Sequence, residues 1–227
     1  MRKIGPMKAL DQLQDPQAPW IILFHGFGAD ASDLQPLAEL IPHAENFNFL
    51  FPQGVLEVPI GPGWTGRAWW PINMERLQQA QSGNQDWDTS IERPDNIERV
   101  RHQAMEMIKA LGIPWNKIIL GGFSQGGMLA VDLALHAPEQ PMGLILMSTA
   151  LVNKAELKPL APQRQGLSFF QSHGESDQVL TLKNGQRLET LLTQSGMKGR
   201  LLKFRGGHEI PTSVLLEIGN YLKDRLS

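Results

Sequence analysis

The chain has 227 residues, a formal net charge of -2 at pH 7 and no cysteine. Its length suits one α/β domain with a substantial core, so we expect a single domain over residues 1–227. The lack of cysteine excludes disulfides, thiolate nucleophiles and cysteine-based metal sites. The weak charge disfavours nucleic acid and anionic membranes as partners.

The first 19 residues are polar, interrupted by prolines and weakly patterned. They lack the apolar core of a signal peptide, and no later apolar run reaches the length of a transmembrane helix. We therefore expect a cytoplasmic protein without integral membrane association. No motif for a metal or a nucleotide occurs, so we expect no cofactor.

Apolar runs of strand length alternate along the chain with stretches of helical periodicity. Strands are predicted at 20–24, 47–51, 117–123, 143–147, 167–171 and 200–204. Helices are predicted at about 33–40, 94–111, 125–136, 182–195 and 214–222. Strands that alternate with helices predict an α/β fold, with a mostly parallel sheet and helices on both of its faces.

Three connecting stretches are predicted as irregular structure. Residues 52–70 are rich in Gly, Pro and Trp, which indicates a long ordered loop over one end of the sheet. Residues 78–90 are polar and are expected to be exposed. Residues 148–166 leave room for a loop and a short helix but not for a cap domain, so we expect an open site.

The pattern G-x-S-x-G occurs at Gly122–Gly126, between a predicted strand and a predicted helix. Small residues beside such a turn let the chain reverse sharply and expose the oxygen of Ser124 next to the free N–H groups of the helix start. A serine hydroxyl in this setting can act as a nucleophile if a base takes its proton. The pattern alone matches by chance in roughly one sequence of this length in fifteen, so it is only suggestive.

The base and the acid are expected later in the chain, in the order serine, acid, histidine. His208 is the only histidine with an acid in a late-strand loop before it, and we predict Asp177 as that acid. Glu175 in the same loop stays open as the orienting acid, and a capping role stays open for Asp177. Asp132 lies about 12 Å along a helix from Ser124 and should point away from it.

Two backbone N–H groups are predicted to stabilise an oxyanion: that of Gln125, after the nucleophile, and that of Phe27, after an early strand. His25 is expected to fix the second loop by a hydrogen bond. Trp69 and then Trp70 are candidates for lining an acyl pocket, although packing of the loop onto the sheet is at least as common a role for such residues.

Five stretches resemble the successive signatures of the phospholipase/carboxylesterase family of α/β-hydrolases, which includes acyl-protein thioesterases and lysophospholipases. They are Phe24–Asp30, Gly66–Trp70, Gly122–Gly127, His173–Asp177 and Gly207–Ile210. The resemblance covers the chain from about residue 21 to 222 and implies a single α/β-hydrolase domain. It also implies Ser124 as nucleophile, Asp177 and His208 as its partners, and Phe27 and Gln125 as oxyanion donors.

These observations predict a serine carboxylesterase that hydrolyses esters of small to medium acyl chains through an acyl-enzyme on Ser124. Its partner would be a small-molecule ester. A lysophospholipase or acyl thioesterase acting on long acyl chains is the alternative. A ligand-binding domain that has lost its chemistry is a more remote one.

Overall fold

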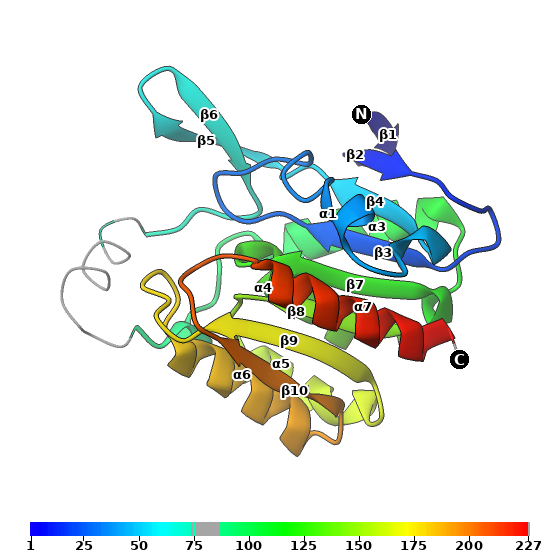
Figure 1. Cartoon of the computed structure of the whole chain (residues 1–227). Helices are drawn as coiled ribbons and strands as arrows, with labels where there is room; N and C mark the ends of the chain where they lie inside the picture. Colours follow the sequence, from blue (N-terminus) through cyan, green and yellow to red (C-terminus); the bar gives the residue numbers. More distant parts are fainter. Residues whose placement is uncertain (74, 76–86, 227) are drawn as a thin grey trace.

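The computed structural model describes residues 1–73, 75 and 87–226. Within them, eight strands form one sheet in the order β1-β2-β4-β3-β7-β8-β9-β10 (Figure 1). The strands are β1 (Arg2–Ile4), β2 (Met7–Gln12), β3 (Trp20–Phe24), β4 (Asn48–Pro52), β7 (Ile118–Phe123), β8 (Gly143–Met147), β9 (Ser168–Gly174) and β10 (Lys198–Phe204). β3, β4 and β7 to β10 pair in parallel, whereas β1 and β2 are antiparallel.

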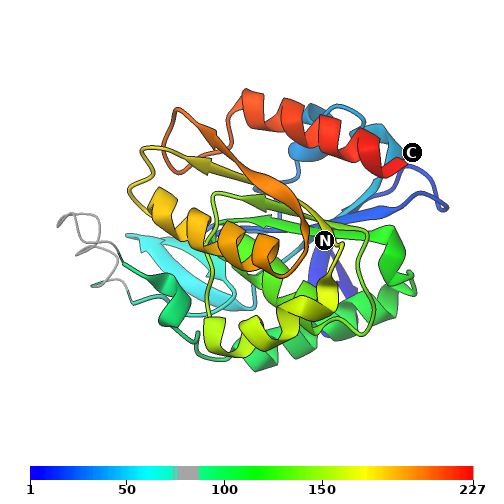
Figure 2. The same ribbon diagram turned by 90° about the horizontal axis from the view of Figure 1, so that it is seen from below.

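Helices cover both faces of the sheet (Figure 2), and each face has its own apolar core. One face carries α1 (Leu37–Leu40) and α7 (Thr212–Leu226). The other carries α3 (Ile97–Leu111), α4 (Gln125–His136), α5 (Lys154–Leu160) and α6 (Leu182–Gln194). Because successive strand residues point to opposite faces, a strand buried on both sides must be apolar throughout, as 20–24 is. The predicted α/β class is confirmed.

Residues 1–19 form more structure than their weak pattern indicates, because β1 and β2 make an antiparallel hairpin at one edge of the sheet. In β2 the side chains of Met7 and Ala9 are buried while Lys8 is exposed. The hairpin is short and turns at Gly5, whose φ is +54°. With three residues in β1 and six in β2, the alternation of apolar and polar side chains is too short to indicate a strand in the sequence.

Residues 52–70 also differ from the prediction of an irregular loop. They contain the antiparallel hairpin of β5 (Leu56–Gly61) and β6 (Trp64–Ala68), which projects from the body of the molecule (Figure 1). The base of this hairpin pairs with the loop after β3, through hydrogen bonds from Gly28 N–H to Arg67 O and from Arg67 N–H to Ala29 O, both 2.8 Å. The hairpin therefore supports a loop that carries a predicted oxyanion donor.

The helix predicted at 33–40 is α-helical only in α1. Before it, the chain makes successive three-residue turns, with hydrogen bonds such as Gln35 N–H to Ser32 O and Leu37 N–H to Leu34 O. Pro36 explains the difference, since it has no N–H to continue an α-helical ladder. The apolar spacing still serves the core, because Leu34 and Leu37 are buried.

A buried ion pair joins helices on the face of the sheet that carries α3 to α6. Arg101 of α3 donates from Nε to Asp132 Oδ2 (2.6 Å) and from Nη2 to Asp132 Oδ1 (2.9 Å). The Asp132 side chain of α4 is completely buried, and Arg101 also donates to Glu156 of α5 at 2.7 Å. Arg101 thus joins the three helices, through a bidentate pair with the buried Asp132 of α4 and a single hydrogen bond to Glu156 of α5.

Replacing Arg101 with Met should destabilise the protein by about 3 to 5 kcal/mol, because the Asp132 carboxylate is left buried without its counter-charge. Urea unfolding followed by circular dichroism measures the loss. Arg99→Met is the matched control, since Arg99 lies on the same helix and is exposed. Equal losses in the two variants would contradict the importance of the buried pair.

Candidate active site

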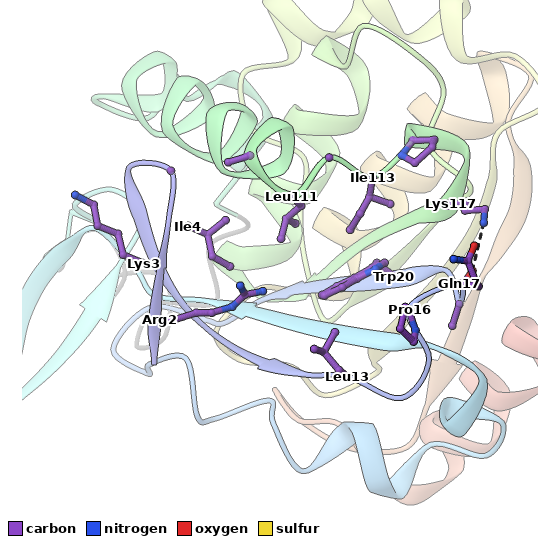
Figure 3. Close-up of a pocket in the computed structure, with 15 residues that line it drawn as sticks. Arg2, Lys3, Ile4, Leu13, Pro16, Gln17, Trp20, Leu111, Ile113 and Lys117 are labelled. Atoms are coloured by element: carbon purple, nitrogen blue, oxygen red, sulfur yellow. Dashed lines mark hydrogen bonds between the residues drawn. The ribbon is translucent and has the colours of Figure 1, made fainter.

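Two cavities lie at opposite ends of the sheet. The larger, of about 730 Å³, lies where the parallel strands begin, over Trp20 and between the β1–β2 hairpin and the segment that follows α3 (Figure 3). None of the described residues that line it is a serine, histidine or carboxylate. The smaller, of about 350 Å³, lies at the carboxyl ends of the strands and is lined by Ser124 and His208. Open α/β sheets bind ligands at this end.

Ser124 stands at the turn between β7 and α4 in a conformation that side chains disfavour, with φ +53° and ψ -120°. Its N–H donates to Met147 O at the end of β8 (3.0 Å). Its carbonyl accepts a hydrogen bond from Thr149 Oγ1 (2.6 Å). Neighbouring structure therefore holds the strained residue in place, as strained positions require.

The two glycines of the motif make room for this turn. A Cβ on Gly126 would lie 1.9 Å from Phe24 O, and one on Gly122 would lie 2.5 Å from the carbonyl carbon of Gly126. Both distances are shorter than any Cβ contact allows, so β3 can approach the turn only because neither residue has a side chain. The G-x-S-x-G pattern follows from this packing.

His208 lies beside the turn and pairs with Asp177. Its Nδ1 is 2.7 Å from Asp177 Oδ2, and the other carboxylate oxygen accepts from the N–H groups of Val179 (2.8 Å) and Leu180 (2.9 Å). Since a carboxylate only accepts, Nδ1 carries the proton and Nε2 is left as an acceptor. Burial alone would raise the pKa of Asp177, but hydrogen bonds from His173 and His208 outweigh it and hold this pKa well below its usual range.

The structure therefore brings together the serine, histidine and acid that the sequence predicts. The ring of Phe123, next to Ser124, packs on the imidazole of His208 at 4.7 Å between centroids. Glu175, the rival acid, is exposed, and its backbone N–H donates to Phe204 O. Asp132, the other rival, is occupied by Arg101.

Phe27 and Gln125, the predicted oxyanion donors, have backbone N–H groups without a protein acceptor in the described residues. Both residues line the cavity with Ser124. Gln125 is the first residue of α4, so its N–H also lies at the positive end of the helix dipole.

The side chain of Gln125 has a second role that the sequence did not reveal. It is buried, and its Oε1 accepts from Trp69 N–H while its Nε2 donates to Trp70 O, both at 2.9 Å. The amide thus clamps the tryptophan pair to the start of α4. Because both backbone groups are buried, losing the amide would leave them without a partner.

Trp70 lines the cavity, but Trp69 does not, contrary to the expectation for Trp69. The Trp69 ring is completely buried, edge-on to Phe24 at 5.3 Å between centroids. Its Nε1 donates to His25 O at 2.8 Å. Trp69 therefore packs the chain after β6 onto the sheet, and its neighbour forms the wall.

His25 fixes the loop after β3, as expected. Its Nε2 accepts from Gly54 N–H (3.0 Å), so Nδ1 carries a proton and donates to Gly26 O (2.7 Å). Burial lowers the pKa of His25 and so favours the neutral ring that this pair of hydrogen bonds needs. The loop holding Phe27 is thus anchored on both sides.

A sequence profile of the phospholipase/carboxylesterase family matches residues 7–226. The chain belongs to this family. It is a serine hydrolase with the α/β-hydrolase fold, as the resemblance of its motifs predicted. Among the described residues, no helix is both long enough and apolar enough to cross a bilayer.

A curated relative is similar to most of this chain, and solved structures share its fold. Acyl-protein thioesterase 1 of Mycosarcoma maydis is 26% identical over 208 residues, which cover 87% of this chain and 85% of the relative. Esterase PE8 has the same fold, with a TM-score of 0.78, 22% identity, and coverage of 96% of this chain and 98% of that one. Acyl-protein thioesterase 2 of Zea mays has a TM-score of 0.72 and 21% identity, covering 97% and 99%.

In this member of the family, a further wall of the cavity comes from Trp87 and the residues that follow it. Trp87 lines the cavity and donates from Nε1 to Glu92 Oε1 (2.8 Å), while its carbonyl accepts from Asn184 Nδ2 of α6 (3.0 Å). Thr89 and Ser90 are buried, so the predicted exposure of 78–90 is wrong for them. Residues 78–86 lie outside the described residues.

Proposed function

We propose that the protein is a carboxylesterase in which Ser124 forms an acyl-enzyme. The Ser124 hydroxyl attacks the ester carbonyl and passes its proton to Nε2 of His208. The tetrahedral intermediate collapses, and His208 returns the proton to the departing alkoxide. Water then attacks the acyl-enzyme with the same histidine as base, which releases the acid and restores Ser124.

The observation that carries this proposal is the His208–Asp177 pair, set beside a serine that its own backbone forces into the cavity. An ionised Asp177 fixes the tautomer of His208 and stabilises the imidazolium that forms during the reaction. The N–H groups of Phe27 and Gln125 would receive the negative charge on the former carbonyl oxygen. The low pKa of Asp177 supports its ionised state throughout the neutral range.

We further propose that the substrates carry small to medium acyl chains. The cavity of about 350 Å³ is at the small end of the range of about 300 to 1,000 Å³ for ligand pockets. Its wall is largely apolar, which suits an acyl group. The apolar lining residues include Trp70, Ile72, Trp87, Met128, Val152, Val179 and Leu180.

Cleavage of thioesters is the second candidate, because the named relatives are acyl-protein thioesterases. The same acyl-enzyme would form, since a thiolate replaces the alkoxide only as leaving group. Long acyl chains would then be preferred if this chain shares the substrates that those names indicate. A cytoplasmic location stays a prediction from composition.

Ser124→Ala should lower kcat for a short p-nitrophenyl ester by about 10⁴ to 10⁶, because the nucleophile is lost. It should also abolish covalent labelling by a fluorophosphonate, detected by mass spectrometry. Ser213→Ala, at an exposed serine of α7, is the control and should keep both properties. Labelling that persists in Ser124→Ala would exclude Ser124 as nucleophile.

Asp177→Asn should lower kcat by about 10⁴, because an amide favours the wrong tautomer of His208. Glu175→Gln should leave the rate nearly unchanged, since that side chain is exposed. Steady-state kinetics on one ester compare the two variants directly. A larger loss from Glu175→Gln would show that the orienting acid is misassigned.

Acyl-chain preference should depend on Trp87. In a series of acetyl, butyryl, octanoyl and palmitoyl p-nitrophenyl esters, kcat/KM should peak at the shorter chains. Trp87→Ala should raise the ratio of octanoyl to acetyl rates by about ten-fold, since each methylene that a pocket accepts is worth about 1 to 3 kcal/mol. Trp64→Ala, at an exposed hairpin residue, is the control. A wild-type preference for palmitoyl esters and thioesters would favour the second candidate.

A further inference from the structure

A second histidine, besides His208, contacts the acid. His173 lies in β9 and is completely buried. Its Nε2 is 2.7 Å from Leu180 O and 3.3 Å from Asp177 Oδ2. Both neighbours are acceptors, so Nε2 must carry a proton and donate to them.

The other ring nitrogen of His173, Nδ1, is buried and makes no hydrogen bond within the described residues. It faces Gly185 of α6, where a Cβ would lie only 2.6 Å away. A proton on Nδ1 would be buried without an acceptor, at a cost of about 1 to 3 kcal/mol. The surroundings therefore select the tautomer that donates toward Asp177.

Both oxygens of the Asp177 carboxylate therefore have hydrogen-bond donors. Oδ1 accepts two backbone N–H groups, and Oδ2 lies between the imidazoles of His208 and His173. In the described structure these two histidines are the titratable side chains that act on Asp177. Nearby, Glu175 is exposed and Glu209 Oε1 accepts from Gly207 N–H, so neither carboxylate is directed at the pair.

We propose that His173 is a positioning residue for the catalytic acid, which holds Asp177 Oδ2 in line with His208 Nδ1 and shares its negative charge. This role rests on the proposed function. Its contact with Leu180 O anchors the acid loop to β9, and its contact with Oδ2 competes with His208 for the same oxygen. Without His173, the full charge of Oδ2 would act on His208.

The consequence appears in the pH dependence of the reaction. His208 must be neutral to accept the serine proton, so kcat/KM rises with pH along an acid limb. A more negative Oδ2 stabilises the imidazolium form of His208 and moves that limb to higher pH. His173→Phe, which keeps a planar ring but removes the donor, should therefore shift the limb upward by about 0.5 to 1 pH unit.

The test compares the kcat/KM profiles of the wild-type enzyme, His173→Phe and His173→Gln on one short ester. The amide nitrogen of Gln reaches the place of Nε2, so His173→Gln should return the limb to its wild-type position. The position of a limb does not depend on how much enzyme is folded, so a poorly folding variant still gives an answer. Fluorophosphonate titration counts the active molecules.

A limb that stays at the wild-type pH in His173→Phe, or that moves equally in both variants, would overturn the role of His173. These outcomes differ from failure of the proposed function. If the wild-type enzyme is not labelled at Ser124, the proposed function fails. If it is labelled and shows an acid limb that His173→Phe does not move, only the role of His173 fails.

Discussion

The site depends on one constraint, the strained backbone of Ser124. A side-chain-bearing residue at φ +53° costs about 1 to 3 kcal/mol, so its conformation persists only where the surroundings hold it. Here Met147 O at the end of β8 and Thr149 Oγ1, two residues later, hold it, while Gly122 and Gly126 let β3 come close to the turn. The chemistry at Ser124 is thus a property of three neighbouring strands.

The other groups of the site come from distant segments of the chain, and each segment is held in place by its own contacts. The loop with Phe27 is held by β6, the wall at Trp87 by α6, and Asp177 by two backbone N–H groups and two imidazoles. A site assembled in this way needs little reorganisation when charge develops during a reaction. It also explains why polar groups as buried as Asp177 are tolerated, since each has its hydrogen bonds.

Sequence reasoning succeeded where the signal is local. The buried strands have continuous apolar runs, and the turn at Ser124 needs small neighbours within two residues, so both are visible in the chain. It failed where pairing at long range decides the structure. The buried position of Trp69 and the anchoring of Thr89 both depend on partners far along the sequence. The side-chain role of Gln125 was missed for the same reason, because its partners lie 55 and 56 residues away.

Gln125 has a consequence for how this enzyme could diversify. In the proposed mechanism its backbone N–H binds the oxyanion, while its side-chain amide holds Trp69 and Trp70, so one residue would serve both the reaction and the selection of substrate. Catalytic rate and substrate selection therefore cannot be changed separately at this position. A substitution of Gln125 that reshapes the wall of the cavity would lower the rate as well. Substrate range is freer to drift at Trp87 and Val152, which line the same cavity and whose side chains make no hydrogen bond to Ser124, His208 or Asp177 within the part of the chain that the structure describes.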